Sequence, residues 1–313
     1  MTIQRLVSLG RVVIDIVTWL DELPERGADV VASGSSITPG GSAFNTLVAA
    51  SRQGLPAVYG GVLGTGPFGD LARRTLDREG IEAPLDSVLD IDTGFALALI
   101  DTAGERTFVT AVGAEAQLTT ERLKALRVES DDALHVSGYS LLQPAARGAI
   151  VSCLAGFDGM VLFDPGPLGH QIPADDLGLL LARADWWSGN RREARLATGL
   201  DDPSDAARAI AGRSGSGAIV RLGPDGCILV EAGRRPEHIR GYVTPGLDTN
   251  GAGDAHVGAF IAALAAGASS LSAAERAAAA AAISVARRGP ATSPTREETD
   301  AFLAERHQRS KAG

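Results

Sequence analysis

The segment 248–254 has the sequence DTNGAGD, which combines a glycine turn, small side chains and a terminal carboxylate. An alanine-rich stretch, 255–266, follows directly and is expected to be helical. The backbone N–H groups of such a turn, together with the dipole of the helix that follows, form a site for an anion. Asp254 would lie beside that site and take a proton from an attacking hydroxyl, as phosphoryl transfer to an alcohol requires. The alternative is ordinary helix capping, in which the acidic residue only complements the dipole.

A second group of polar residues lies early in the chain. Gly40 and Gly41 allow a ligand to approach the backbone closely, and Asn45 can both donate and accept hydrogen bonds one helical turn further on. Asp15 follows a predicted strand, and its carboxylate can accept hydrogen bonds from two sugar hydroxyls. The group indicates a site for a polyhydroxylated ligand. Taken alone, Asp15 is also compatible with a turn and Asn45 with a helix start.

Two further motifs suit a nucleotide and its metal ion. Asn190 and Glu193 are three residues apart at a predicted helix start, where they could hold a hydrated Mg²⁺ near phosphate oxygens. The same spacing predicts a capping box, in which the two residues only stabilise the helix end. Arg221, Gly223 and Gly226 form a glycine turn after a strand, which is suited either to passing beneath a nucleotide or to an ordinary hairpin.

The elements that must position these residues alternate between strands and helices. This alternation predicts an α/β fold in which helices cover both faces of a doubly wound, mainly parallel sheet. The strands are expected at 3–9, 57–63, 133–136, 159–163, 184–187 and 218–222, and the helices at 44–53, 68–79, 144–154, 191–198 and 205–212.

Two segments, 11–37 and 94–112, depart from this alternation. The first carries alternating β-branched residues, and the second reads as a hairpin that turns at 102–105. We expect the two segments to pair into a small β lid within a single domain that covers residues 1–313. The alternative is an ordinary extension of a sheet edge.

Composition narrows the class of protein. The 313 residues are 45% hydrophobic and 21% charged, with a formal net charge of -9. No block of basic residues is present, which argues against nucleic acid as the main ligand. The only cysteines, Cys153 and Cys227, are too few for a disulfide framework or a zinc site. The chain also shows no signal-peptide pattern and no apolar run of membrane-spanning length, so we expect a cytoplasmic protein without a membrane partner.

Other chemistries have weaker signals. The segment 64–69, GTGPFG, matches the G-x-G-x-x-G pattern of a dinucleotide-dependent oxidoreductase. However, Pro67 removes an N–H from the loop, and the loop is not the first strand-to-helix turn. A non-catalytic sugar-binding module would keep Asp15 and Asn45 but would not need Asp254. His256 lies on a different helix face from Asp254, which favours a structural role.

Taken together, these motifs resemble the PfkB, or ribokinase-like, family of carbohydrate and nucleoside kinases. The resemblance rests on Asp15, on the Gly-Gly pair followed by Asn45, on the pair 190 and 193, on the turn 220–223 and above all on the segment 248–254. The tail 288–293, RGPATS, also looks like the final nucleotide and cation loop of the family. The similarity spans nearly the whole chain.

The resemblance implies a role for each motif. Asp254 is implied as the general base, with the anion hole at Gly251, Ala252 and Gly253. The acceptor would contact Asp15, Gly40, Gly41 and Asn45, and ATP would contact Asn190, Arg221, Gly223 and Gly226. Glu193 would bind Mg²⁺ through water, and a monovalent cation, usually K⁺, would lie at Asp248, Asn250 and Ser293.

Several positions depart from the family pattern. Asn250 and Arg221 both stand where Thr is common, and Arg221 adds a charge near the phosphates. Glu115 stands where Asn is frequent, and Ala278 where some members carry an Asn near the adenine.

We therefore predict an ATP-dependent phosphotransferase that acts on a primary hydroxyl of a small sugar. The alternative acceptor is a nucleoside phosphorylated on its ribose 5′-hydroxyl, with Trp19 and Phe44 stacking on the base; apolar lid packing would explain these aromatics equally well. A homodimer through the lid is a further expectation.

Overall fold

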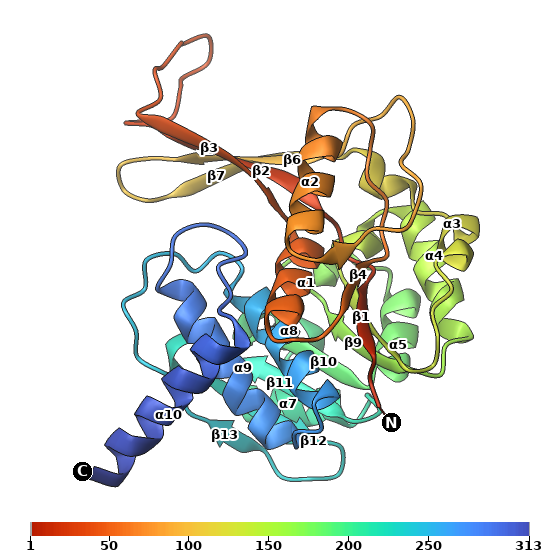
Figure 1. Cartoon of the computed structure of the whole chain (residues 1–313), viewed down its shortest axis with the longest axis vertical. Helices are drawn as coiled ribbons and strands as arrows, with labels where there is room; N and C mark the ends of the chain where they lie inside the picture. The colour runs from red at the N-terminus through yellow and green to blue at the C-terminus, as the bar shows by residue number, and fades with distance from the viewer. Residues whose placement is uncertain (1, 313) are drawn as a thin grey trace.

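The computed structural model describes residues 2–312 and is built on a nine-stranded sheet with the order β13-β12-β11-β10-β9-β8-β1-β4-β5 (Figure 1). The seven strands from β11 to β5 are parallel, whereas β12 and β13 extend one edge by antiparallel pairing. The strands are β1 (Arg5–Ser8), β4 (Ala57–Tyr59), β5 (Ile81–Glu82), β8 (Asp132–Ser137), β9 (Met160–Asp164), β10 (Trp186–Asn190), β11 (Gly217–Arg221), β12 (Cys227–Glu231) and β13 (Glu237–Ile239). The predicted parallel, doubly wound sheet is confirmed.

The order of the strands marks one place along this sheet. β1 lies between β4 and β8, so the chain reverses its direction of winding there. In open α/β sheets, ligands bind beyond the carboxyl ends of the strands near such a reversal. A ligand site is therefore expected beyond the carboxyl ends of the strands near β1.

Helices cover both faces of the main sheet. Neighbouring residues of β1 show the two layers, because Leu6 packs into one core cluster and Val7 into the other. One face carries α1 (Ser42–Arg52), α2 (Pro67–Arg78), α8 (Ala252–Ala265) and α9 (Ser270–Val285), with α10 (Arg296–Ala312) packed on α9. The other face carries α3 (Thr120–Ala125), α4 (Pro144–Ala155), α5 (Ala174–Arg183), α6 (Arg191–Thr198) and α7 (Pro203–Ala211). Short 3₁₀ turns are η1 (Ala114–Gln117), η2 (Ser140–Leu142), η3 (Gly169–Gln171) and η4 (Gly223–Asp225). Across residues 2–312, none of the helices has the length and apolarity that a membrane crossing requires.

Two strands differ from their predicted ranges. The strand expected at 57–63 ends at Tyr59, and the next residue, Gly60, stands in a crowded position where a Cβ would lie 2.8 Å from the side chains of Leu9 and Leu126. The strand expected at 184–187 is instead Trp186–Asn190. Ser188 and Gly189 pair with β11. Because neither residue has an apolar side chain, the hydrophobic pattern did not predict that the strand includes them.

A separate four-stranded sheet, here called the small sheet, has the order β3-β2-β6-β7. Its strands are β2 (Val13–Trp19), β3 (Gly34–Gly40), β6 (Phe95–Ile100) and β7 (Arg106–Ala111), and β6 and β7 form the expected hairpin. Figure 1 shows the small sheet extending away from the main body beside α2. It is assembled from the two segments that depart from the strand–helix alternation.

The carboxylate of Glu115 holds the base of the small sheet. It accepts hydrogen bonds from the backbone N–H groups of Gly94, at 2.9 Å, and Gly113, at 3.0 Å. A Cβ on Gly94 would lie 2.3 Å from Glu115 Oε1, so this position has room only for glycine. Glu115, a departure from the family pattern, thus has a structural partner at the point where β6 begins and β7 ends.

Candidate active site

Three neighbouring parallel strands end in polar side chains at one edge of the main sheet. Strand β9 ends at Asp164, β10 at Asn190 and β11 at Arg221. The start of α8 reaches the same edge, because a Cβ on Gly253 would lie only 3.2 Å from Arg221 Nη2. The segment 248–254 therefore meets the carboxyl ends of the strands.

Asp254 and Asn45 are in direct contact although 209 residues separate them. Asn45 Nδ2 donates a hydrogen bond to Asp254 Oδ2 at 2.9 Å. The contact depends on the close approach of α1 and α8, since a Cβ on Gly258 would lie 2.4 Å from the carbonyl oxygen of Thr46. The structure thus brings the two predicted motifs together into one site.

The protein environment raises the pKa of Asp254 above the value that this side chain has in water. Burial raises the pKa of Asp254 to about 7, and the hydrogen bond from Asn45 opposes this rise. The nearby charges of Asp164 and Asp15 also raise the pKa, whereas that of Arg221 lowers it. A carboxyl group with a pKa near neutrality is suited to accept and release a proton.

The turn before α8 presents backbone N–H groups toward the site. Gly251 has a φ of 74°, a left-handed conformation that favours glycine, and it lies at the N-terminal end of α8. Among the described residues, no hydrogen-bond acceptor faces the N–H groups of Gly251 and Gly253. The N–H of Ala252 donates to the carbonyl oxygen of Thr249 at 3.3 Å, so it is partly used within the turn. Free N–H groups at a helix start attract an anion.

Asp15 lies on β2 of the small sheet, above the double glycine. A Cβ on Gly40 would lie 2.2 Å from Asp15 Oδ2, and one on Gly41 would lie 2.5 Å from the carbonyl oxygen of Arg11. Within residues 2–312, the Asp15 carboxylate takes part in no hydrogen bond or ion pair. Burial raises the pKa of Asp15 to about 6. Asp15 is thus a desolvated acceptor without a protein donor.

Asn190 and Glu193 form the capping box that their spacing allows. The Asn190 side chain accepts from the Glu193 N–H at 2.9 Å, and Glu193 Oε2 accepts from the Asn190 N–H at 2.7 Å. Glu193 Oε1 also accepts from Asn190 Nδ2 at 2.8 Å. Burial raises the pKa of Glu193, and Asp164 adds to the rise, while Arg221 opposes it. The capping interpretation is confirmed, and it leaves both carboxylate oxygens already hydrogen-bonded.

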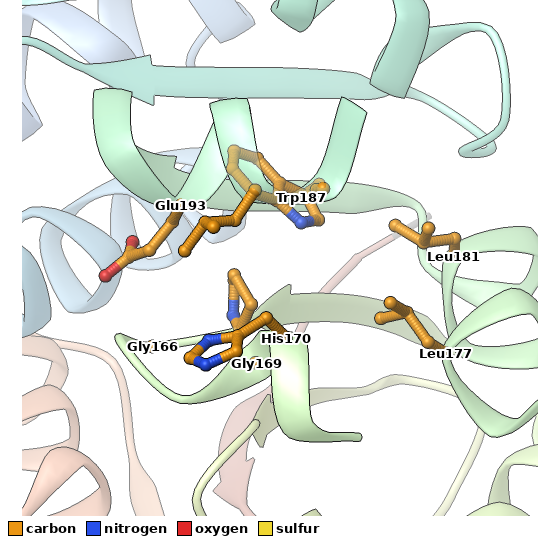
Figure 2. Close-up of a pocket in the computed structure, with 10 residues that line it drawn as sticks. Gly166, Gly169, His170, Leu177, Leu181, Trp187 and Glu193 are labelled. Atoms are coloured by element: carbon orange, nitrogen blue, oxygen red, sulfur yellow. The ribbon is translucent and has the colours of Figure 1, made fainter. Parts of the chain in front are cut away.

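Glu193 also lies at one end of a small pocket between the loop that follows β9, helices α5 and α6, and Trp187 of β10. Figure 2 shows its carboxylate pointing away from the apolar side chains of Trp187, Leu177 and Leu181. Asp15, Asn45 and Asp254 do not line this pocket. The carboxylate of Glu193 lies instead beside Arg221, at the end of β11.

Arg221, the last residue of β11, supplies a positive charge among the polar side chains at the ends of β9 and β10. Its Nη1 donates to Asp164 Oδ2 at 3.1 Å and to Ser188 Oγ at 2.7 Å, and its Nη2 lies 3.6 Å from Glu193 Oε2. Both Arg221 and Asp164 are largely buried, with side-chain exposures of 14% and 11%. The guanidinium therefore holds a fixed position beside Gly253.

The glycine turn that follows Arg221 is a hairpin. Strands β11 and β12 pair in antiparallel fashion around Gly223 and Gly226, whose φ angles are 65° and 93°. A Cβ on Gly226 would lie 2.0 Å from the carbonyl oxygen of Ile239, whereas nothing lies within 4 Å of such an atom on Gly223. The hairpin interpretation is confirmed, and the backbone at Gly223 stays open to a ligand.

The three residues expected at a cation site already contact protein groups. Asp248 Oδ1 accepts from Arg106 Nη2 and from the N–H of Asn250, both at 3.0 Å, and its Oδ2 accepts from Gly289 N at 3.2 Å. The carbonyl oxygen of Ser293 accepts from Arg52 Nη1 at 2.8 Å. Burial raises the pKa of Asp248, but these hydrogen bonds more than offset it and lower the pKa overall.

Other sequence-based alternatives lose support in the structure. The N–H groups of Phe68 and Gly69 at the start of α2 donate to the Asp92 carboxylate at 3.0 and 2.7 Å, so an internal anion fills the place of a pyrophosphate. Phe44 is only 3% exposed and packs in the core, so it cannot stack on a nucleobase. His256 is also buried, and burial lowers its pKa to about 3, which agrees with a structural role.

Three residues of the site were not singled out from the sequence. Asp164 and Ser188 contact Arg221, and Arg106 contacts Asp248. Asp164 had a recognisable signal, because it ends an apolar run directly before a Pro-Gly-Pro turn, where a parallel strand ends. Ser188 and Arg106 had none, since their partners lie far away in the sequence.

Comparison with known proteins identifies the family. The profile of the pfkB family of carbohydrate kinases matches residues 3–297. The chain belongs to the pfkB family. The sugar kinase YegV of Escherichia coli (strain K12) is 32% identical over 305 residues, which cover 95% of this chain and 93% of the relative. The ATP-dependent ribose-1-phosphate kinase of Halopiger xanaduensis is 30% identical over 318 residues, covering 96% of this chain and 99% of that relative.

Solved structures of ribokinases have the same fold as this member of the pfkB family. The ribokinase of Thermotoga maritima superimposes with a TM-score of 0.84 at 26% identity and covers 97% of this chain and 100% of its own. An Arabidopsis thaliana ribokinase complexed with ribose and ATP has a TM-score of 0.83 at 24% identity, covering 96% of this chain and 99% of its own. The ribokinase-like fold is therefore shown over nearly the whole chain.

The position of Arg221 leads to a prediction for the pH dependence of this kinase. Because Arg221 lowers the pKa of Asp254, Arg221→Met should raise that pKa above its value of about 7. The acid limb of the kcat/KM profile, where activity is lost as pH falls, should move to higher pH. Arg221→Lys keeps the charge and should leave the limb near its wild-type position. Identical acid limbs in all three proteins would contradict the prediction, because they would show that Arg221 does not act on Asp254 or that Asp254 does not set the limb.

Loss of Arg221 should also destabilise the fold, so both variants need a stability control. Removing one partner of a buried ion pair costs about 3–5 kcal/mol. Thermal unfolding and circular dichroism would establish the temperature range in which Arg221→Met is folded, and the pH profiles would be measured there.

Proposed function

We propose that this protein is an ATP-dependent kinase that phosphorylates a primary hydroxyl of a small sugar, with Asp254 as the general base. The observation that carries the proposal is the 2.9 Å contact between Asn45 and Asp254. The contact supports the proposal because it brings a carboxylate with a pKa of about 7 against Asn45 on one side, while the N–H groups of Gly251 and Gly253 close to it are free. A base beside an anion site is the arrangement that transfer to a hydroxyl needs.

The acceptor would lie between the small sheet and α1. Asn45 Oδ1 is buried without a hydrogen-bond partner among the described residues, and the Asp15 carboxylate also lacks a donor. Both are acceptors suited to sugar hydroxyls, because an unpaired buried acceptor is unfavourable until a ligand supplies a donor. Gly40 and Gly41 would allow the sugar to approach the backbone.

The nucleotide would lie along the ends of β10 and β11. We assign its contacts to Asn190, Arg221, Gly223 and Gly226. The Arabidopsis ribokinase of the same fold was determined with ribose and ATP, and a candidate ribokinase II of Escherichia coli, 23% identical, with ATP and Mg²⁺. Bound Mg²⁺ would neutralise phosphate charge in the reaction.

Glu193 fits a water-mediated contact to Mg²⁺ better than direct coordination. Both of its carboxylate oxygens already accept N–H hydrogen bonds, and Arg221 lies nearby. Hydrated Mg²⁺ usually keeps several of its waters, which can bridge to such a carboxylate.

In the proposed reaction, the acceptor hydroxyl loses its proton to Asp254 as its oxygen attacks the terminal phosphorus of ATP. The new oxygen–phosphorus bond forms as the bond to the ADP oxygen breaks, and ADP leaves with its electron pair. The N–H groups of Gly251 and Gly253, with the weaker donor of Ala252, stabilise the charge on the transferring group. The small sheet would act as a lid that limits the access of water to the site. We assign it to the same single domain, which spans residues 1–313.

Asp254→Asn tests the assignment of the base. The amide cannot accept the proton, so turnover should fall by about two to four orders of magnitude. The measurement is ADP release across a panel of pentoses, hexoses, sugar acids and nucleosides, compared for the wild type and the variant. Acceptor binding, measured by calorimetry, should remain largely intact.

Asp15→Ala is the matched control, because it removes a carboxylate from the acceptor side only. We expect a raised KM for the acceptor with a smaller loss of kcat. Near-normal turnover in Asp254→Asn would rule out Asp254 as the base, and no ADP release with any acceptor in the wild type would overturn the proposed function.

A second test concerns the monovalent cation. Asp248, Asn250 and Ser293 stand where the family resemblance places K⁺, but Arg106 already supplies a positive charge at Asp248. We therefore propose that turnover depends little on whether Na⁺ or K⁺ is present, and that Arg106→Met creates a dependence on K⁺. Initial rates in matched Na⁺ and K⁺ buffers decide this; strong activation of the wild type by K⁺ would contradict it.

A third test concerns assembly. Ile37 and Val109 lie on the same face of the small sheet and are 53% and 54% exposed, which supports a homodimer through this face. Val109→Asp should then yield monomers in sedimentation equilibrium. Leu179 on α5 is similarly exposed, at 59%, so Leu179→Asp is the control that should stay dimeric. A wild-type protein that is monomeric at all concentrations would disprove the interface.

A further inference from the structure

Arg11 is a partly buried cation without a counter-ion. Among residues 2–312, its side chain makes no hydrogen bond and no ion pair, and its Nε is buried without a partner. By contrast, Arg52, Arg147 and Arg221 each face a carboxylate at 2.7, 2.9 and 3.1 Å. Leaving a guanidinium group partly desolvated and unpaired is unfavourable, so its position calls for a functional explanation.

The backbone of Arg11 adjoins the acceptor side of the site. Its carbonyl oxygen accepts a hydrogen bond from Ala43 N at 3.2 Å. The same oxygen would lie 2.5 Å from a Cβ on Gly41, so the chain at Arg11 touches the double glycine. Arg11 thus lies between β1 and β2, next to residues proposed to hold the sugar.

The side chain of Arg11 extends over Tyr139. The guanidinium carbon lies 5.0 Å from the centre of the Tyr139 ring, a distance that allows a cation–π interaction. Tyr139 follows β8, and its ring approaches the loop after β9, where a Cβ on Gly166 would lie 3.4 Å away. The Arg11–Tyr139 pair therefore borders the carboxyl ends of β1, β8 and β9.

Tyr139 faces the same space as the carboxylates of the site. Burial raises the pKa of its hydroxyl, the charge of Arg11 lowers it, and Asp254, Glu193 and Asp164 raise it further. Among the described residues, the Tyr139 hydroxyl has no hydrogen-bond partner. One cationic and one neutral donor thus lie side by side at the edge of the site, and neither is bonded to a protein acceptor among the described residues.

We propose that Arg11 and Tyr139 form a subsite for an anionic group of the acceptor, a phosphate or carboxylate that the sugar carries away from the hydroxyl that is phosphorylated. The planar guanidinium pairs well with either anion, and the tyrosine hydroxyl supplies a further donor. The anion would also provide the missing counter-charge for Arg11. This inference rests on the proposed function and specifies its substrate class.

Pairs of matched acceptors test the subsite. Ribose 1-phosphate is compared with ribose, and gluconate with sorbitol, so that each pair contrasts an anion with a neutral polyol. For at least one pair, we expect the wild type to favour the anionic member in kcat/KM. Arg11→Met should reduce this preference by about 10- to 100-fold, the size expected for loss of a charged hydrogen bond. Tyr139→Phe should reduce it less, and Arg11→Lys should restore part of it.

Arg213→Met is the matched control, because Arg213 is exposed at the opposite end of β11 and should leave the preference unchanged. The phosphate pair and the carboxylate pair show which anion the subsite takes. A wild type that prefers neither anion overturns the inference. So does an Arg11→Met variant that lowers kcat/KM equally for both members of a pair, because that result indicates a structural role.

A binding measurement separates this inference from the proposed function. Calorimetry with ribose 1-phosphate and gluconate on Asp254→Asn, with and without Arg11→Met, reports the subsite without turnover. Affinity that depends on Arg11 supports the subsite even if no acceptor is phosphorylated. Phosphorylation of neutral sugars, with anion affinity independent of Arg11, would retain the kinase and reject the subsite.

Discussion

The close packing of α1 on α8 is the constraint from which the site follows. Gly258 has no side chain, so the backbone of α8 lies against that of α1, and this approach allows Asn45 to reach Asp254. Each helix carries one half of the site, since α1 starts at the double glycine and α8 starts at the free N–H groups. A larger residue at 258 would separate the two halves even though it touches neither ligand.

The second constraint is the balance of charge at the strand ends. Arg221 is surrounded by Asp164, Glu193 and Asp254, so the group is negative when every carboxylate is ionised. This imbalance contributes to the raised pKa of Asp254 and favours protonation of its carboxylate close to neutral pH. A polyanion that entered this region would meet these carboxylates and would therefore need additional positive charge beside it.

Much of the fold could be predicted from local patterns. Apolar runs separated by glycine turns gave the order of strands and helices, and the right-handed crossover rule gave the parallel sheet. The boundaries were less accurate where a buried strand contained polar or small residues, as at Ser188 and Gly189. The family resemblance assigned roles to Asn45 and Asp254, but the direct contact between them could not be predicted, because residue types do not give distances.

The partners of charged residues were the least predictable part of the site. Glu193 satisfies both the capping and the ligand pattern, and only its hydrogen bonds show that the capping box forms. Asp248 pairs with Arg106 across 142 residues, and Arg11 pairs with no carboxylate in the described chain. Such partners depend on how loops from different elements meet, which hydrophobic periodicity does not record.

The ion pair between Arg106 and Asp248 connects the small sheet to the turn that leads into α8. A movement of β7 that keeps this ion pair would also move the turn that contains Asp248. When two ligands bind to coupled sites, each changes the affinity of the other by the same factor. The contact between Arg106 and Asp248 thus offers a physical route by which a ligand at the small sheet and a ligand at the turn before α8 would influence each other's affinity.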